Sequence, residues 1–235
     1  MKLVLAICIV SCLLVFGCAS TGGGTQHSGA SYPRAVAGAW KATYLPHYNG
    51  TDIPLKAQDK PGDFIVTYYS MNSTFRFDQV VGKDNQALRT APGYDTEENR
   101  WYNTSTGVYT CSRKFNSDSF VCHKDDNPLY LSDLYVYFLN EDFIRNPQFY
   151  KVQEIESRVI AGAEAKCFKL TGLADGYQRL ALIYGNYTLC QSKEGAPLYL
   201  QLGLPAVSSR EYLATSYSTE VYDTDFSLPA PISTR

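Results

Sequence analysis

The chain has 235 residues, a formal net charge of −2, 45% hydrophobic residues and 19 tyrosines. The near-neutral charge excludes the basic footprint of a nucleic-acid-binding protein and a polybasic membrane patch. The length suits one domain with a real hydrophobic core, and the tyrosines suit strands, ligand clefts and adhesive surfaces.

The first 17 residues predict an export signal. Lys2 precedes a mostly apolar run over residues 3–16, which is shorter than the roughly 20 residues that a membrane-spanning helix needs. Residues 14–18, Leu-Val-Phe-Gly-Cys, resemble the lipobox of prokaryotic lipoproteins. We therefore expect a signal peptide over 1–17 and a diacylglyceryl thioether on Cys18, whose two chains suffice for stable anchoring. The alternative is an ordinary signal peptide followed by an incidental cysteine.

Residues 18–32 predict a flexible tether, because nearly all of them after Cys18 are Ser, Thr, Gly or Ala and cannot bury apolar area. We expect residues 33–230 to form one β domain and residues 231–235 to form a tail. The anchor would hold this domain on the outer side of the cytoplasmic membrane, in the periplasm or at the cell surface.

Short runs of β-branched and aromatic residues, broken by Gly, Pro, Asn and Asp, predict strands and hairpins through most of the domain. In chain order these runs are residues 39–44, 64–69, 75–78, 100–102, 107–113, 120–123, 151–160, 165–171, 179–184, 187–191, 198–202 and 214–222.

One segment has a different pattern and predicts a helix near residues 128–146. Leu131, Leu134, Tyr135 and Phe138 fall on one face at helical spacing after a proline that suits a first helical turn. The alternative is a pair of strands, since residues 135–137, Tyr-Val-Tyr, also form a good β sequence.

The cysteines predict two disulfides. Cys8 and Cys12 leave with the signal, and Cys18 is the lipid site. An even number in an oxidising compartment implies two bridges with three pairings open. We choose the sequential pairing because a turn signal at 116–119 places the first two cysteines side by side; the predicted bridges are Cys111–Cys122 and Cys167–Cys190. The spacing does not match a zinc site, and we expect no metal.

Four Asn-X-Ser/Thr sequons would be surface glycan sites in a host that glycosylates, and several can arise by chance in a chain rich in Ser and Thr. They begin at Asn49, Asn72, Asn103 and Asn186.

Several segments carry a family resemblance. Residues 162–170 follow a "Gly, polar, Cys-aromatic-basic-aliphatic" strand, residues 189–199 a "Cys, polar, acidic-Gly, small, Pro-Leu" hairpin, and residues 223–229 an "Asp-x-Asp-Phe-x-Leu-Pro" ending. Together with residues 73–78, they resemble uncharacterised prokaryotic lipoproteins of the LolA-like superfamily, in order over most of residues 36–230.

The resemblance implies a mainly β fold with minor α content. The sheet would be a strongly curved antiparallel half-barrel, with one or more helices covering its concave face. The helix predicted near 128–146 would be such a cover, so that Leu131, Leu134, Tyr135 and Phe138 would line the hollow. Family members of known function hold acyl chains or lipoproteins there. Any sheet packed on helices also needs an apolar face, so a filled core remains the alternative.

The sequence shows no catalytic motif, so we expect neither an enzyme nor a cofactor. The folded part contains only His47 and His123 as histidines, and it has no nucleophile elbow, zinc-protease motif, P-loop or dinucleotide fingerprint. His123 follows Cys122, but a disulfide removes that thiol and neighbouring strand residues face opposite sides.

Two pairs of acidic residues could bind Ca²⁺ or act as acid and base. These are Asp125 with Asp126, and Asp223 with Asp225. We interpret them as solvated turn or helix-end acids. We expect Phe226 and Leu228 to fix the last strand by being buried.

Three functions follow in order of preference. The first is a non-enzymatic lipoprotein that binds a lipid or another lipoprotein's acyl chain. The second is an envelope or surface module with a filled core that binds a protein partner. The third is a hydrolase with scattered carboxylates, which would need two of them to converge in a cleft with raised pKa values.

Overall fold

The computed structural model describes residues 33, 38–50, 64–90, 92–93, 95–125, 143–144, 146–173, 186–204 and 208–233. The strands in this part are β1 Trp40–Gly50, β2 Phe64–Met71, β3 Thr74–Val81, β4 Thr96–Thr104, β5 Gly107–Lys114, β6 Phe120–Lys124, β7 Tyr150–Ile160, β8 Ala163–Gly172, β9 Asn186–Gln191, β10 Pro197–Leu204 and β11 Ser208–Ser218. The short helices are α1 Gln86–Arg89, η2 Pro147–Phe149 and η4 Asp223–Phe226.

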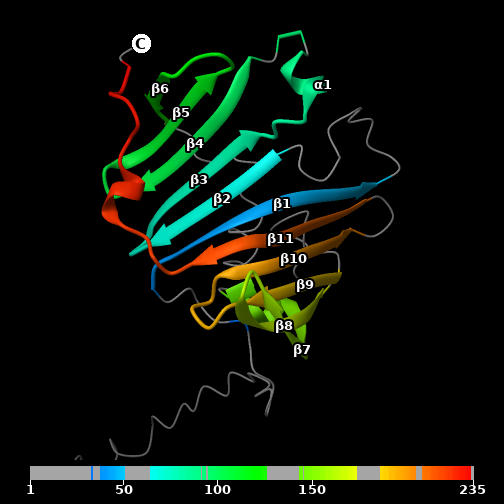
Figure 1. Ribbon diagram of the computed structural model, residues 1–235. Coiled ribbons are helices and arrows are strands. Elements are labelled where there is room, and N and C mark those ends of the chain that lie inside the picture. Colours follow the sequence, from blue (N-terminus) through cyan, green and yellow to red (C-terminus); the bar gives the residue numbers. More distant parts are fainter. Residues whose placement is uncertain are drawn as a thin grey trace, which may run out of the picture.

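All these strands form one antiparallel sheet in the order β6-β5-β4-β3-β2-β1-β11-β10-β9-β8-β7 (Figure 1). β1 and β11 pair in its middle, from Lys41 opposite Ser218 to Gly50 opposite Ser208. The sheet is open, because β6 and β7 are its two ends. The predicted mainly β, unclosed architecture is therefore confirmed.

The sheet is strongly curved at the β7 end. β7 comes close to β11, although β8, β9 and β10 lie between them in the sheet. A flat sheet would keep these two strands about 19 Å apart. The Arg158 guanidinium of β7 also lies 5.7 Å from the ring centroid of Tyr199 in β10. This curling matches the half-barrel that the resemblance implies.

Eleven of the twelve predicted strands are present in the described residues, several of them with longer bounds than predicted. Residues 179–184 lie outside the described residues. So does nearly all of the helix predicted near 128–146, including Leu131, Leu134, Tyr135 and Phe138. The strand predicted over 214–222 is wrong in its bounds, since β11 spans Ser208–Ser218. The chain leaves the sheet there because the Asp225 carboxylate accepts the Tyr222 backbone N–H at 2.9 Å and starts η4.

Most of the main core lies on one face of the sheet, which we call the core face; Cys167, Cys190 and Tyr199 of the same cluster lie on the other face, in register with Leu213. Alternate residues of β1, such as Trp40 and Tyr44, are fully buried on the core face. The rings of Tyr44 and Tyr68 pack edge to face with their centroids 5.5 Å apart, and the Tyr44 hydroxyl donates to the Pro197 carbonyl. Packed aromatic rings of this kind fill the core face over β1–β3.

The opposite face carries a second cluster over β4–β6, which the end of the chain covers. Tyr102, Tyr109 and the Cys111–Cys122 disulfide are buried there, and Leu228 packs against them. Ile232 forms a parallel bridge with Cys122, and the Ser233 N–H donates to the Cys122 carbonyl at 2.8 Å. Figure 1 shows this segment, in red, running across the sheet from β11 to β6.

The expected role of Phe226 and Leu228 is therefore corrected. Both side chains are half-buried; Phe226 is the last residue of η4 and Leu228 follows it, so neither lies in or beside the end of β11 at Ser218. The reason is a contact between distant segments: the Arg76 guanidinium of β3 donates to the Asp225 carbonyl at 2.6 Å and draws η4 over the sheet.

The structure pairs the cysteines sequentially, Cys111 with Cys122 and Cys167 with Cys190. Each bridge joins residues that face each other on neighbouring strands. Three of the sequon asparagines are exposed: Asn72, Asn103 and Asn186. The use of these sequons and of Asn49 in β1 stays a prediction.

The signal peptide, Cys18 and the tether lie outside the described residues. Within the described ones, we find no helix with the length and hydrophobicity to span a bilayer.

Candidate ligand pocket

A pocket of about 610 Å³, open on one side, lies where β8, the β9–β10 turn and the end of β11 meet. Its volume falls within the roughly 300–1,000 Å³ of small-molecule sites. Its lining consists of Ala163, Glu164, Lys166, Phe168, Gln191, Ser192, Lys193, Glu194, Tyr217 and Thr219.

The pocket opens on the core face. On β8, Phe168 pairs with Leu189 of the main core, and Lys166 points to the same side two residues earlier. On β11, Tyr217 lies opposite the buried Ala42. Side chains from distant strands therefore converge at the end of the main core, where the sheet curls.

The β9–β10 turn forms the polar wall of the pocket. The Ser192 N–H donates to the Ala196 carbonyl at 2.9 Å, and the Gly195 N–H donates to the Ser192 carbonyl at 3.0 Å. Gly195 adopts a φ of 82°, which favours glycine. The Ser192 hydroxyl oxygen accepts the N–H groups of Glu194 and Ala196 at 3.2 and 3.3 Å. These bonds fix the turn and aim Glu194 at the pocket.

Tyr217 joins this turn to β11. Its hydroxyl donates to Glu194 Oε2 at 2.6 Å and lies 3.1 Å from Ser192 Oγ. Lys193 Nζ is 3.6 Å from Glu194 Oε1, and the Lys193 side chain is 89% exposed. The tyrosine, rather than the lysine, therefore holds the carboxylate in place.

These contacts determine the protonation states of Tyr217 and Glu194 in the polar wall. Burial and the hydrogen bond to Glu194 raise the pKa of Tyr217 to about 12. Burial opposes ionisation of Glu194, but the hydrogen bonds from Tyr217 and from the backbone outweigh it and lower the pKa of Glu194. At neutral pH the wall presents a carboxylate and a neutral phenol. A carboxyl group with a lowered pKa is poorly suited to act as a general acid.

The pocket lining contains two formal charges of each sign and two aromatic rings, those of Phe168 and Tyr217. The acids are Glu164 and Glu194, and the bases are Lys166 and Lys193. Lys166 Nζ also lies 3.1 Å from Glu154 Oε1 on β7, in an exposed ion pair. Phe168 supplies a buried apolar surface on the same strand as Lys166.

The described residues that the sequence singled out as chemical candidates do not converge, and Asp126 lies outside the described residues. His123 is half-buried on β6, and its Nδ1 is buried without a hydrogen-bond partner. Asp125 accepts the Thr110 hydroxyl at 3.3 Å, and Asp223 lies in η4 with Asp225. Among the described residues, no group of three or more His, Cys, Asp or Glu could hold a metal ion.

The sequence does not predict the pocket. The acidic-Gly motif predicts a hairpin but gives no sign that the hairpin borders a ligand site. No local signal indicates that Tyr217, 23 residues after Glu194, returns to it.

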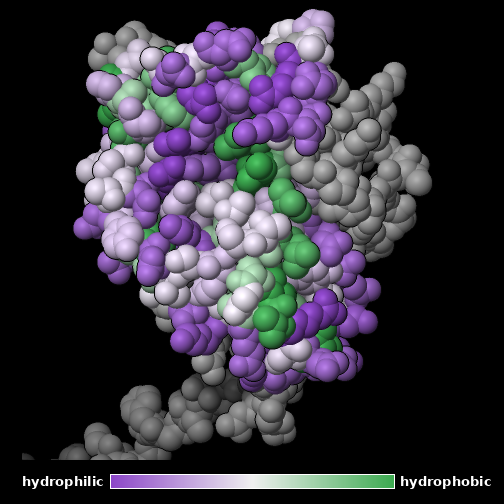
Figure 2. Space-filling view, viewed as in Figure 1, coloured by the Kyte–Doolittle hydropathy of each residue, from purple (hydrophilic) through white to green (hydrophobic). Residues whose placement is uncertain are grey.

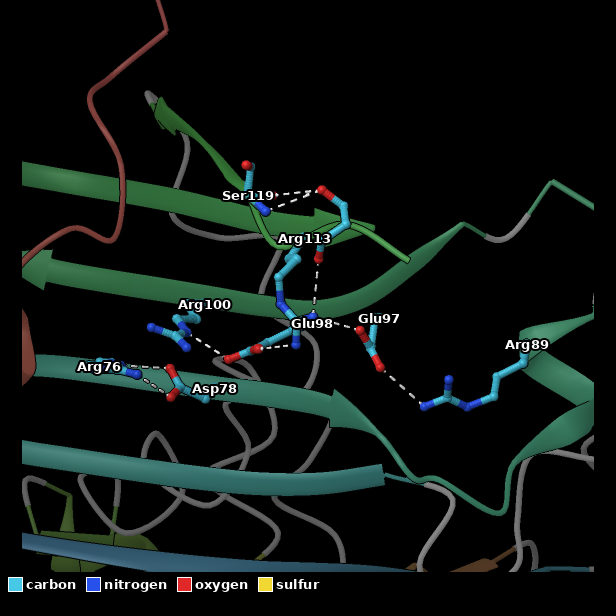
Figure 3. A network of polar contacts seen from close by, with 9 residues as sticks. Arg76, Asp78, Arg89, Glu97, Glu98, Arg100, Arg113 and Ser119 are labelled. Carbon is cyan, nitrogen blue, oxygen red and sulfur yellow. Dashed lines mark hydrogen bonds and ion pairs between the residues drawn. The ribbon is translucent and has the colours of Figure 1, made fainter. Parts of the chain in front are cut away.

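A network of charges occupies the opposite face over β3–β5 (Figure 3). Glu98 accepts Arg100 Nε at 2.6 Å and Arg113 Nη2 at 2.9 Å, and Arg76 forms a two-pronged pair with Asp78. Burial would raise the pKa of Glu98, but the two arginines lower it. Since these acids and bases are matched to one another, we interpret the network as structural.

An apolar row crosses the middle of the same face. Leu45 of β1 lies opposite Leu213 of β11, which lies opposite Tyr199 of β10. Leu45 and Leu213 are 37% and 45% exposed, and Ile65 on β2 is 38% exposed. Figure 2 shows a narrow hydrophobic band across the middle of the visible surface, bordered by hydrophilic residues.

Comparisons with known proteins show similarity in fold. No family profile matches the chain, and no curated protein sequence is similar enough to count as a relative. MucB has a similar structure at 11% identity and a TM-score of 0.47, over 83% of this chain and 58% of MucB. The chain thus spans little more than half of MucB.

Two further solved structures match more of their own length. The Mycobacterium tuberculosis lipoprotein LppX is 9% identical with a TM-score of 0.39, over 77% of this chain and 88% of LppX. A LolA superfamily protein from Nitrosomonas europaea is 8% identical with a TM-score of 0.28, over 83% and 93%. At these identities the likeness concerns the fold alone.

Proposed function

We propose that the protein is a non-enzymatic envelope lipoprotein, anchored through Cys18, that binds one lipid or similar amphipathic molecule in the pocket beside Phe168. The observation that carries this proposal is the pocket of about 610 Å³ on the core face, where the apolar Ala163 and Phe168 adjoin a polar wall. The ligand's apolar part would lie against Phe168, and its polar part would face Glu194 and Tyr217.

Native mass spectrometry of the chain from residue 18 onward, with Cys18→Ser, tests the proposal. The protein is purified from a bacterial envelope without detergent and compared with an Ala163→Phe variant. Ala163 lines the pocket. Its replacement by phenylalanine should narrow the pocket, because the larger side chain takes up space that a ligand would otherwise occupy. We expect a lipid adduct on the parent protein and a large loss of it in the variant.

A matched control introduces phenylalanine at a position outside the pocket. Thr171 is exposed at the far end of the same strand, so Thr171→Phe should leave the adduct unchanged. A folded parent protein that shows no adduct, even after incubation with lipid vesicles, would contradict lipid binding.

The apolar row of Leu45, Leu213 and Ile65 favours a second candidate function, in which the sheet docks on a protein of the envelope. Exposed apolar side chains that adjoin one another mark interaction surfaces more often than isolated ones do. A photo-crosslinking amino acid at position 213 would form a specific adduct in the envelope, whereas the same group at exposed Glu220 would not. Equal, diffuse labelling at both positions would contradict this function.

We do not propose hydrolysis. The carboxylate that faces the pocket most directly, Glu194, has a lowered pKa, whereas the acid of a carboxylate pair needs a raised one.

A further inference from the structure

We infer that the pocket recognises a zwitterionic head group, with Glu194 receiving a primary ammonium and Lys166 facing the acidic group beside it. This inference rests on the proposed function and adds the chemical class of the ligand's polar end. The corresponding lipid class is an amine-bearing phospholipid of the phosphoethanolamine type.

Glu194 is suited to bind a cation. Its side chain is only 17% exposed, yet it lines the pocket. A carboxylate can accept about four hydrogen bonds, and the Tyr217 hydroxyl takes one position on Oε2. Lys193 stays 3.6 Å away, beyond the 2.7–3.2 Å or so of a good N–H···O bond, and is almost fully exposed. A ligand ammonium can therefore approach a carboxylate that is positioned but not neutralised by a buried partner.

The rest of the lining balances that charge. Lys166 extends from β8 on the same side as Phe168, and its pairing with Glu154 is solvent-exposed and weak. Lys166 thus adds a positive charge to the pocket lining, which as a whole is neutral, with two acids and two lysines. A neutral site with separated charges suits a zwitterion better than an anion.

Tyr217 keeps the site in this state. Its hydroxyl bonds both to the Glu194 carboxylate and to Ser192, so the carboxylate cannot rotate away from the pocket without losing a charge-assisted hydrogen bond. The head-group end is therefore built before a ligand arrives, while Phe168 marks the apolar end.

The test compares two phospholipids with identical acyl chains, one with an ethanolamine and one with a glycerol head group. Both are offered in vesicles to the chain from residue 18 onward carrying Cys18→Ser, and binding is measured by native mass spectrometry. We expect the ethanolamine lipid to bind about tenfold more tightly, the effect of one charge-assisted hydrogen bond. Glu194→Gln keeps the shape of the side chain and should abolish this preference, while Glu220→Gln at an exposed position outside the pocket should keep it.

The outcomes separate this inference from the proposed function. Equal binding of the two lipids by the parent protein would overturn the inference and leave lipid binding intact. A preference that survives in a folded Glu194→Gln variant, verified by its thermal unfolding, would overturn the assignment to Glu194. Binding of neither lipid would overturn the proposed function and the inference together.

Discussion

Glu98 illustrates how single residues stabilise this sheet. Its side chain is 9% exposed, and its carboxylate bonds Arg100 on the same strand, β4, and Arg113 on the neighbouring strand, β5. The guanidinium of Arg100 also lies 4.3 Å from the Phe120 ring centroid, so the charge is packed as well as paired. A carboxylate in such surroundings contributes stability only while it is ionised.

We predict that Glu98→Gln lowers the free energy of unfolding by about 2 kcal/mol at pH 7, because it removes hydrogen bonds between charged groups. The pKa of Glu98 is lowered from its ordinary 4.5 in the folded protein. Its contribution is therefore present above pH 4.5 and is lost as the pH falls through the lower, folded-state pKa. Urea unfolding at pH 7 and pH 3 should show that the gap between parent and variant shrinks in acid.

The exposed Glu220 supplies the control for this experiment. Glu220→Gln should change the stability by less than about 0.5 kcal/mol at either pH. A gap for Glu98→Gln that is as wide at pH 3 as at pH 7 would show that packing, rather than charge, stabilises this position.

At the scale of elements, the two disulfides join strands that are already hydrogen-bonded neighbours. Removing a bridge by paired Cys→Ala substitutions should cost about 3 kcal/mol in denaturant unfolding. We expect a larger loss for Cys167 and Cys190, since they are separated by 23 residues rather than 11 and lie in the main core. Peptide mapping without reduction should recover these two pairs, and recovery of any crossed pair would contradict the assignment.

The end of the chain is the second element whose contribution can be measured. Leu228 packs on the cluster formed by Tyr102, Tyr109 and the Cys111–Cys122 bridge. Leu228→Ala should therefore lower the unfolding free energy by about 1 kcal/mol, less than a fully buried leucine would because the side chain is half-buried. Leu173→Ala, at a position that is 41% exposed, should cost less in the same thermal or urea titration.

A larger change at this element checks the same packing by another readout. Deleting residues 223–235 should uncover the cluster and remove the acceptor that Arg76 uses at Asp225. We expect increased binding of a hydrophobic dye. A deletion variant with the stability and dye binding of the full chain would mean that the segment does not cover the sheet in solution.

The sheet edges show how an open sheet avoids pairing with other chains. β6 is only five residues long, and Ile232 near the end of the chain forms a backbone β-bridge with its Cys122. β7 is eleven residues long but carries exposed Glu154, Glu156 and Arg158, and its register shifts between Ile155 and Arg158. Charges and irregularities of this kind oppose the addition of a further strand. The openness of the half-barrel is thus compatible with a protein that does not aggregate through its edges.

Over the whole molecule, the strands could be predicted because alternation is a local signal. In β3, Phe75 and Phe77 face the core, which the sequence shows directly. Arg76 and Asp78 alternate with them and would be expected in solvent, yet they are buried, because the distant end of the chain covers them. The pairing of β1 with β11 and the convergence of Tyr217 on Glu194 have the same non-local origin. Sequence patterns therefore predicted the elements but not the pocket.

The last prediction concerns how the molecule is held in place. If residues 1–17 are removed as predicted, five cysteines remain, and the four that pair within the sheet leave Cys18 as the cysteine for the predicted lipid. The chain from Cys18 to Trp40, the first residue of β1, could reach at most about 75 Å. A lipid on Cys18 would therefore keep the domain and its pocket close to a membrane, where a lipid ligand is abundant.

We predict that the native chain carries diacylglycerol on Cys18 and fractionates with membranes, detected by mass spectrometry of the N-terminal peptide and by labelling with an alkyne fatty acid. The matched control replaces residues 1–17 with a non-lipoprotein signal peptide and carries Cys18→Ser, so that export is kept and the thioether is not formed. This control should be soluble in the envelope, because the near-neutral domain lacks the polybasic patch that could replace two acyl chains. If the control also fractionated fully with membranes, the attachment would reside in the folded domain, and the exposed row of Leu45, Leu213 and Ile65 would be the first surface to mutate.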